Sequence, residues 1–382
     1  MLYIRCSTLI LNNRLVQDGA ILMDGQKIVA VGPRAIVPAP AAARQVDAHG
    51  LIAAPGYIDW QLNGGFGEDF TENPESLWKT AARLPEHGVT SFLPTIITAP
   101  LEVYKTARQV LARGMPAGFQ GAQPLGYHFE GPYLNPAKKG AHNPLHLRAP
   151  SKTETADWSR KNGVWLVTLA PELPGANELV RALRKKGIVV SAGHSLATYQ
   201  QAIEAIQAGV NCATHLFNAM PPLDHRAPGL VAACLLDKQL TVGLIPDGIH
   251  ADPAMLALAW KHTGPKRMTI VTDAMAALAM PAGSYLLGDY EVIVNENSAR
   301  LQNGTLAGSI LQMDQAVRNL VKFTGCSLPQ AVTTATGNVA RLIRARTRGR
   351  LTPGLTADLV LLDAHGNLAA TYVRGELAFS AI

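Results

Sequence analysis

Residues 55–64 read PGYIDWQLNG, and this stretch combines the features of a buried strand with an unusual polar pattern. Its aromatic and β-branched residues pack well in sheets, so they are typical of a core strand. Asp59, Gln61 and Asn63 recur at every second position, and on a strand they would face the same side. The pattern predicts a strand that carries a polar ladder to a functional site.

The middle of the chain repeats this kind of apolar run and alternates it with helical segments. The candidate strands are GYIDWQL, VTSFLPT, PLGYHFE, VWLVTLAPE, IVVSAGH, CATHLF, TVGLIPDG and MTIVTDA. Such alternation is typical of a parallel sheet, and eight units over about 220 residues match the length of a TIM (β/α)8 barrel. An open doubly wound sheet is the alternative, but no GxGxxG motif follows the first strand.

The two ends of the chain have a different pattern. Residues 1–54 alternate short β-like runs with Asn-Asn and Asp-Gly turn signals, and the segment near the C-terminus does the same in ADLVLLD and LAATYVRGELAF. We expect both ends to meet in one small β-sandwich-like domain. The predicted organisation therefore joins residues 1–54 and 346–382 around a metal-dependent catalytic barrel at 55–345.

Composition narrows the class of protein. The chain of 382 residues is 48% hydrophobic and has no long apolar run or signal-peptide pattern, so we expect a soluble cytoplasmic protein with a large core. Its four cysteines form no CxxC pair, which disfavours a disulfide framework or a thiolate zinc site.

The net charge of +6 raises the question of nucleic-acid binding. The densest basic cluster, RARTRGR at 344–350, has no interleaved aromatic residues and no recognition-helix pattern, so we interpret it as a solvated face. We expect neither a nucleic-acid nor a membrane partner. A positive field would instead favour a small anionic substrate.

Polar residues occur where candidate strands end, which is the rim on which a TIM barrel builds its active site. Glu130, His194 and His215 follow the apolar runs LGYHF, IVVSAG and CAT. Burying such a group without a partner costs several kcal/mol, and a divalent metal ion supplies that partner. A Glu with two His is a common ligand set for catalytic zinc. Separate core hydrogen bonds are the alternative for any one of them, but three together favour a metal.

Asp273 closes the run TIVTDA on the eighth candidate strand. A carboxylate at that position can take a proton from water and later return it to a leaving group, which typically contributes about 10²- to 10⁴-fold in rate. The alternative is a helix N-cap before AMAALAM, and spacing alone leaves it open.

Three loops at the same rim carry further candidates. The Gly/Pro-rich loop GPYLNPAKKGAHNP contains His142, and LFNAMPPLDHRAPG contains Asn218 and Arg226. The seventh strand is followed by PDGIHAD, with Asp247 and His250. Arg226 and His250 could hold a phosphate or carboxylate, whereas surface pairing and turn structure are the alternatives.

In chain order, the motifs PGYIDWQLNG, HFEGPYLN, KKGAHNP, VVSAGHS, ATHLFNAM, DGIH, VTDA and LAGS resemble the N-acetylglucosamine-6-phosphate deacetylase family of the amidohydrolase superfamily. The resemblance implies a distorted TIM barrel with a small β-domain made from both termini. It also implies a hydrolase of amino-sugar catabolism that converts N-acetyl-D-glucosamine 6-phosphate to D-glucosamine 6-phosphate and acetate. N-acetylgalactosamine 6-phosphate as substrate, or a non-catalytic scaffold, are the alternatives.

The resemblance also implies roles for matching positions. Glu130, His194 and His215 would bind one divalent metal ion per subunit, usually Zn²⁺. Asp273 would act as general base and then general acid, and His142 would polarise the acetamide carbonyl. Because phosphate-binding residues come partly from a neighbouring subunit in this family, a homodimer is implied. The substrate would be held by Ala141, Asn218, Ala219, Arg226, Asp247, Gly248, Ile249, His250, Leu306, Ala307 and Gly308.

The polar ladder of residues 59–63 gains a meaning from the same resemblance. Many amidohydrolases place His-x-His at the end of the first strand to bind a second metal ion, whereas this chain has Gln61 and Asn63. Amides are poor zinc ligands beside imidazole, so we expect a vestigial second site and a one-metal enzyme. The role of Asp59 stays open.

Overall fold

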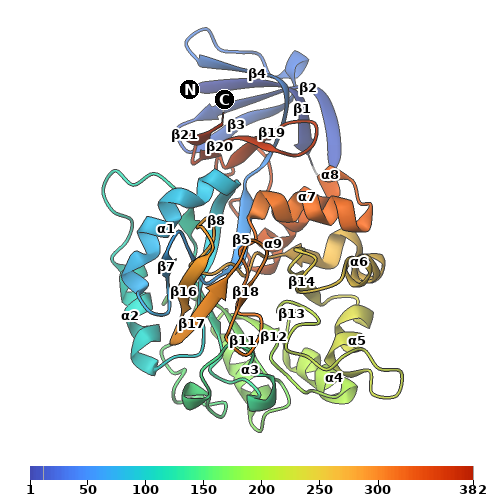
Figure 1. Cartoon of the computed structure of the whole chain (residues 1–382). Helices are drawn as coiled ribbons and strands as arrows, with labels where there is room; N and C mark the ends of the chain where they lie inside the picture. The colour runs from blue at the N-terminus through green and yellow to red at the C-terminus, as the bar shows by residue number, and fades with distance from the viewer. Residues whose placement is uncertain (12, 382) are drawn as a thin grey trace.

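The structure is a computed structural model that describes residues 1–11 and 13–381, and it consists of a barrel with a smaller sheet beside it (Figure 1). The barrel strands are hydrogen-bonded in the order β15-β14-β13-β12-β11-β10-β8-β5, and every pair is parallel. All eight predicted strands are present, so the TIM-barrel prediction is confirmed. Their bounds are β5 (Tyr57–Leu62), β8 (Val89–Ile96), β10 (Tyr127–Glu130), β11 (Val164–Leu169), β12 (Val189–Ala192), β13 (Cys212–Ala213), β14 (Thr241–Leu244) and β15 (Met268–Ile270).

The barrel closes between the first strand and the segment that follows the last one. Leu62 forms a parallel bridge with Ala274. The backbone N–H of Asp273 donates to the Gln61 carbonyl oxygen at 3.0 Å, and that of Asn63 donates to the Ala274 carbonyl oxygen at 2.8 Å. The closure therefore brings the polar ladder of β5 beside Asp273.

Helices follow most of the strands and cover the barrel, as the sequence pattern predicts. In α3 the buried residues Ala176, Leu179, Val180 and Leu183 recur at helical spacing, so one face packs on the sheet. The helix bounds are α1 (Leu77–Arg83), α2 (Leu101–Ala112), α3 (Ala176–Lys185), α4 (Tyr199–Ala208), α5 (Gly229–Leu236), α6 (Pro253–Arg267), α7 (Met313–Thr324), α8 (Leu328–Thr334) and α9 (Gly337–Leu342). No helix in the described part of the chain is long and apolar enough to cross a bilayer.

The two ends of the chain meet in a second sheet, which confirms the predicted β-domain of both termini (Figure 1). Its central contact is the antiparallel pairing of β19 with β4, while β1 and β4 run parallel. The exact domain boundaries at residues 54 and 346 stay a prediction. The sheet order is β21 (Glu376–Ser380), β20 (Leu368–Val373), β19 (Leu359–Leu362), β4 (Arg44–Pro55), β1 (Leu2–Leu11), β2 (Arg14–Asp24) and β3 (Lys27–Pro33).

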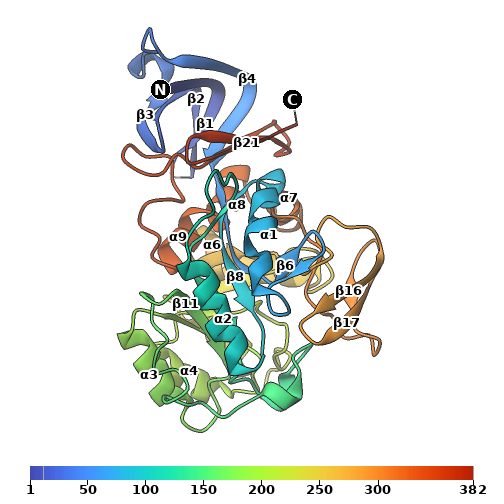
Figure 2. The ribbon, with the colours of Figure 1, turned by 90° about the vertical axis from the view of Figure 1, so that its left-hand side faces the viewer.

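A small antiparallel sheet that the sequence analysis does not anticipate follows the eighth barrel strand. It consists of β16 (Gly283–Leu287), β17 (Tyr290–Val294) and β18 (Ala299–Arg300), and it projects from the side of the barrel (Figure 2). Its buried residues pack against Met275 to Ala277, which directly follow Asp273. This β16–β18 hairpin sheet therefore lies next to the catalytic rim.

Candidate active site

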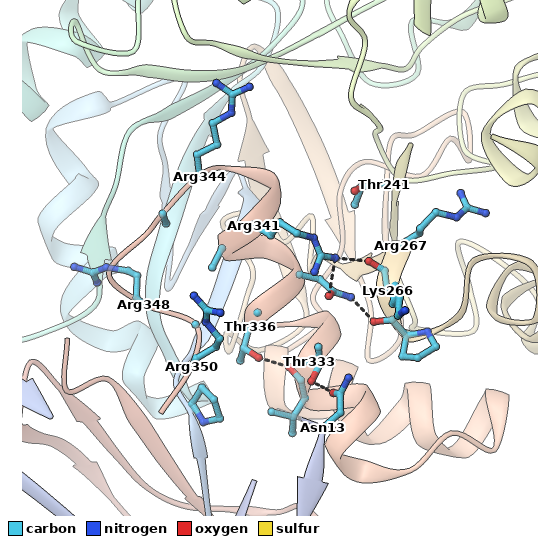
Figure 3. A pocket seen from close by; sticks show the side chains of 18 of the residues that line it. Asn13, Thr241, Lys266, Arg267, Thr333, Thr336, Arg341, Arg344, Arg348 and Arg350 are labelled. Atoms are coloured by element: carbon cyan, nitrogen blue, oxygen red, sulfur yellow. Dashed lines mark hydrogen bonds between the residues drawn. The ribbon is translucent and has the colours of Figure 1, made fainter. Parts of the chain in front are cut away.

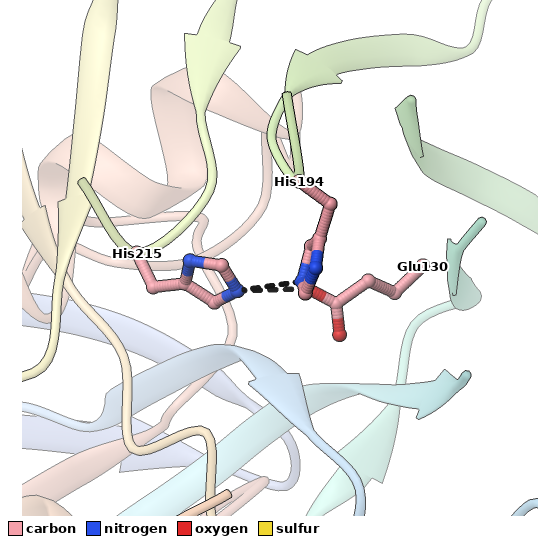
Figure 4. A group of neighbouring side chains, drawn as sticks. All are labelled: Glu130, His194 and His215. Atoms are coloured by element: carbon pink, nitrogen blue, oxygen red, sulfur yellow. Dashed lines mark hydrogen bonds and ion pairs between the residues drawn. The ribbon is translucent and has the colours of Figure 1, made fainter. Parts of the chain in front are cut away.

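Glu130, His194 and His215 converge on one point at the rim (Figure 4). Glu130 is the last residue of β10, whereas the two histidines lie just beyond β12 and β13. The Glu130 Oε1 atom lies 3.3 Å from Nε2 of His194 and 3.1 Å from Nε2 of His215. Among the described residues, these three make up the one group whose ligand atoms lie close enough to hold a metal ion.

The hydrogen bond of the other ring nitrogen decides the tautomer of His194. Its Nδ1 lies 2.9 Å from the Lys138 carbonyl oxygen, which can only accept, so Nδ1 carries the proton. Nε2 then presents a lone pair toward the Glu130 carboxylate and toward His215 Nε2, which is 3.1 Å away. Converging lone pairs repel one another unless a cation lies between them, so these residues fit a divalent metal ion.

Electrostatics at Glu130 agree with a cation site. Burial alone would raise the pKa of Glu130, but the close His194 and His215 imidazoles outweigh it and lower that pKa well below its ordinary value. Glu130 is therefore an anion in the barrel interior, available as a metal ligand. His128, two residues earlier, instead bonds the Thr168 hydroxyl at 2.8 Å and lies outside the cluster.

Asp273 is held beside this cluster by the polar ladder of β5. Its Oδ1 accepts from Gln61 Nε2 at 3.1 Å and from Asn63 Nδ2 at 2.8 Å. Burial and the nearby Glu130 carboxylate raise the pKa of Asp273 to about 6. The backbone at Asp273 has a φ of 50°, a region that is uncommon for residues other than glycine and recurrent at functional sites. Asp273 is therefore a positioned carboxylate that readily exchanges a proton.

His142 faces the cluster from the opposite loop. The backbone N–H of Thr98 donates to His142 Nδ1 at 3.2 Å, so Nδ1 is an acceptor and the proton of the neutral ring lies on Nε2. Burial and the neighbouring His194 lower the pKa of His142 well below its ordinary value, which keeps the ring neutral. The Nε2 atom lies 3.9 Å from Glu130 Oε2. His142 thus presents an N–H donor to a ligand above the cluster.

These groups line one cavity of about 480 Å³, which is within the usual range for a small-molecule site. Predicted residues in its wall are Asn63, Glu130, Ala141, His142, His194, His215, Asn218, Ala219, His250, Asp273, Leu306 and Gly308.

A family model described as "Amidohydrolase family" matches residues 52–378. The chain belongs to the amidohydrolase family. This match confirms the amidohydrolase superfamily in the resemblance drawn from the motifs, and the relatives below confirm its narrower part.

Individual relatives of this amidohydrolase have similar lengths. N-acetylglucosamine-6-phosphate deacetylase of Bos taurus is 40% identical over 96% of this chain and 94% of its own length. N-acetylgalactosamine-6-phosphate deacetylase of Escherichia coli O157:H7 is 38% identical over 96% of this chain and 97% of its own length. A mutant N-acetyl-D-glucosamine-6-phosphate deacetylase of Mycobacterium smegmatis, solved with N-acetyl-D-glucosamine-6-phosphate, superimposes with a TM-score of 0.91 at 34% identity and covers 99% of both chains.

Other predicted binding residues of this amidohydrolase lie around the cavity rather than in its wall. Asp247 Oδ2 accepts from His250 Nδ1 at 2.6 Å, and Asp247 Oδ1 accepts from the backbone N–H groups of Ile249 and His250. Asp247 therefore orients His250, whose Nε2 makes no hydrogen bond with another described residue and can face a ligand. Arg226 lies on an exposed loop outside the cavity of its own chain, so its role in binding stays a prediction.

Sequence reasoning missed the part of the cavity wall that comes from the β16–β18 segment. Leu287, Asn303 and Thr305 come from the hairpin segment between β16 and residue 306. The alternation in YEVIV with flanking Gly-Asp and Asn-Glu-Asn turns was the available signal for this hairpin. Thr98 was missed as well, because nothing in its local sequence indicates that its backbone N–H sets the tautomer of His142.

Gln61 and Asn63 occupy the positions predicted for a vestigial second-metal site. Their amide nitrogens face carboxylates, which can only accept, so in this chain they act as hydrogen-bond donors. We expect the double variant Gln61→His with Asn63→His to raise the metal content from about one toward two ions per chain, since imidazole is a far better ligand than an amide. Mass spectrometry of the metals bound per chain measures this.

A single Asn303→His variant places a histidine on the hairpin side of the same cavity and serves as the control for that experiment. Equal metal content in the double variant and in this control would contradict the prediction.

Asp59, whose role the sequence left open, ties β5 to the segment before Asp273. Its Oδ2 accepts from the Thr272 hydroxyl at 2.5 Å, and its Oδ1 accepts from the backbone N–H of Gln61 at 3.2 Å. Burial raises the pKa of Asp59 to about 7. Asp59 is thus a positioning residue that holds the Thr272 side chain and the Gln61 backbone in place.

The burial of Asp59 predicts how the free energy of unfolding changes with pH. Because the folded-state pKa of Asp59 exceeds the value of about 4 in an unfolded chain, its contribution to stability is complete below about pH 4 and is lost as the pH rises through about 7. In the parent chain we expect the free energy of unfolding to fall between about pH 5 and pH 7. In Asp59→Asn this fall should be smaller, by at most about 1.4 kcal/mol per pH unit. Urea titrations at both pH values measure it. The exposed Asp157→Asn should leave the slope unchanged, and equal slopes for all three chains would refute the assignment.

Proposed function

We propose that this amidohydrolase hydrolyses N-acetyl-D-glucosamine 6-phosphate to D-glucosamine 6-phosphate and acetate. The names of its relatives at about 40% identity support this substrate. The observation that carries the proposal is that Asp273, an N–H donor on His142, and the cluster of Glu130, His194 and His215 surround one cavity. Amide hydrolysis needs a proton acceptor, an oxyanion donor and an activated water together.

We propose one divalent ion, Zn²⁺, as the cofactor held by Glu130, His194 and His215. When bound, such an ion lowers the pKa of a water and polarises the amide carbonyl.

In the proposed reaction Asp273 manages the protons. Its Oδ1 is occupied by the amides of Gln61 and Asn63, whereas no hydrogen bond reaches Oδ2 from the described residues. Oδ2 is therefore the atom that accepts a proton from the attacking water as the water oxygen adds to the carbonyl carbon. The same atom then gives that proton to the amide nitrogen as the C–N bond breaks, so the amine leaves neutral together with acetic acid, which loses its proton to solvent and becomes acetate.

His142 stabilises the developing charge in this scheme. Its ring is neutral with the proton on Nε2, so it donates to the carbonyl oxygen as that oxygen becomes negative. A donor that is already oriented does not have to reorganise during the reaction.

The sugar and phosphate would be held by the remaining predicted groups. His250, oriented by Asp247, supports phosphate binding from within the chain. Because Arg226 lies outside its own cavity, we propose that it completes the phosphate site of a second copy in a homodimer. Arg suits this role, since its planar fork matches a phosphate.

Acetate release, measured together with metal content, tests the function. The proposal requires about one metal ion per chain and a much larger kcat/KM for N-acetylglucosamine 6-phosphate than for the unphosphorylated sugar. A chain without metal or acetate release would be a scaffold, and the proposal would be wrong.

N-acetylgalactosamine 6-phosphate is the second candidate, because a relative at 38% identity carries that activity in its name. The two substrates differ in one hydroxyl, so kcat/KM measured for both epimers separates the candidates.

A further inference from the structure

A second cavity lies at the face of the barrel opposite to the active site. Its volume is about 810 Å³, and within the described residues the two cavities share no lining residue. Pro55, Thr241 and Arg267 line it, and these residues precede or begin β5, β14 and β15. The catalytic groups follow the C-terminal ends of the same strands, so this cavity opens at the N-terminal face of the barrel.

Cationic side chains dominate the wall of this basal cavity, and no Asp or Glu among the described residues lines it. Figure 3 shows Arg344, Arg348 and Arg350 on one side of the cavity, with Lys266 and Arg267 across from them. The cluster RARTRGR therefore borders a hollow, in which Arg344, Arg346 and Arg350 are solvent-exposed, as predicted, and Arg348 is half-buried. The lining cations are Lys238, Lys266, Arg267, Arg341, Arg344, Arg346, Arg348 and Arg350.

Some of these cations build the wall and are already paired. Arg348 forms an ion pair with Asp358 at 2.9 Å and donates to the Ser91 hydroxyl at 2.5 Å. Arg267 donates to backbone carbonyl oxygens, including that of Leu240 at 3.0 Å. These contacts give the cavity a rigid base.

Other cations of the same wall have no such partner. Within the described part of the chain, the side chains of Arg344, Arg346 and Arg350 make no hydrogen bond and no ion pair. Their charges act on neighbouring arginines: burial lowers the pKa of Arg160, and Arg344 and Arg346 lower it further by repulsion. Burial and then Arg344 likewise lower the pKa of Arg184. The side chains of Arg344, Arg346 and Arg350 are thus not paired with an acidic group among the described residues.

We propose that the basal cavity binds a small polyanion with two or more phosphate groups. Arginine forks match phosphate oxygens, and the volume suits a small molecule. No aromatic residue is among the described lining residues, so a nucleobase would find no ring to stack on. The ligand is therefore a condensed phosphate or a bisphosphorylated sugar rather than a nucleotide or nucleic acid.

Titration calorimetry on the full chain with its metal tests this site, with tripolyphosphate and fructose 1,6-bisphosphate as separate probes at about 150 mM salt. The double variant Arg346→Gln with Arg350→Gln removes two unpaired charges from the wall. We expect this double variant to weaken binding of the preferred probe about tenfold or more. Each hydrogen bond between an arginine and a phosphate contributes to the binding free energy, and the variant removes such bonds at two positions. The probe that binds tighter identifies the source of the phosphates.

The control variant is Arg5→Gln with Arg44→Gln, which changes the net charge equally at exposed positions of the terminal sheet that do not line the cavity. It should bind as the parent chain does. The proposal is overturned if neither probe binds more tightly than about 1 mM, if both double variants weaken binding equally, or if a DNA duplex binds while both probes do not. Thermal unfolding without probe establishes that each variant is folded.

Discussion

Replacing Asp273 with Asn is expected to lower kcat by about 10²- to 10⁴-fold while the chain keeps its metal ion. Asparagine has nearly the same shape and can still meet Gln61 and Asn63, but it cannot accept a proton at Oδ2. Because the proton is transferred in the transition state, KM should change much less than kcat. Acetate release under saturating substrate measures the rate, and mass spectrometry measures the metal.

Two comparisons make the Asp273 experiment specific. Asp157→Asn changes an exposed carboxylate that pairs with Arg108 and should leave kcat unchanged. Asn63→Ala removes one hydrogen-bond donor to Asp273 Oδ1 but keeps the carboxylate. Its kcat should therefore fall less than that of Asp273→Asn. Near-native turnover of Asp273→Asn with metal bound would eliminate Asp273 as the proton carrier, even if the substrate assignment holds.

Replacing His215 with Gln is expected to reduce bound metal from about one ion per chain to a small fraction, and acetate release to background. In the proposed site His215 supplies one of the three protein ligands found among the described residues, and an amide replaces imidazole poorly. The same variant should lose the stabilisation that the ion gives the folded chain. That stabilisation is about 4 kcal/mol when free metal is 1,000 times its Kd.

A chelator provides the matching test of that stabilisation. In the parent chain, metal removal should lower the unfolding temperature, because Glu130 then stays buried among its neighbours without a cation. In His215→Gln the chelator should have almost no effect, and the exposed His262→Gln should behave as the parent does. A His215→Gln chain with a full complement of metal would contradict the ligand assignment.

Much of the fold was readable from local pattern. The eight strands, the intervening helices and the meeting of both termini follow from apolar periodicity and turn residues, which act over short stretches of chain. The hairpin of β16–β18 was missed, because its strands are short and half exposed and give a weak pattern. The basic cluster was interpreted as a solvated face, and Arg344, Arg346 and Arg350 are indeed exposed. Only Arg348 differs, because it pairs with Asp358 and with Ser91, a residue 257 positions away in the sequence.

By itself, the sequence determined the barrel class, the family, and the identity of the metal-ligand and proton-transfer candidates, since each residue directly follows a recognisable strand. Only the tertiary structure decided what each polar atom does. The tautomers of His142 and His194 depend on Thr98 and Lys138, and the donor role of Gln61 depends on Asp273, a partner 212 residues away. Hydrogen-bond direction is set by which donors and acceptors meet in space, and that meeting is created by barrel closure rather than by local sequence.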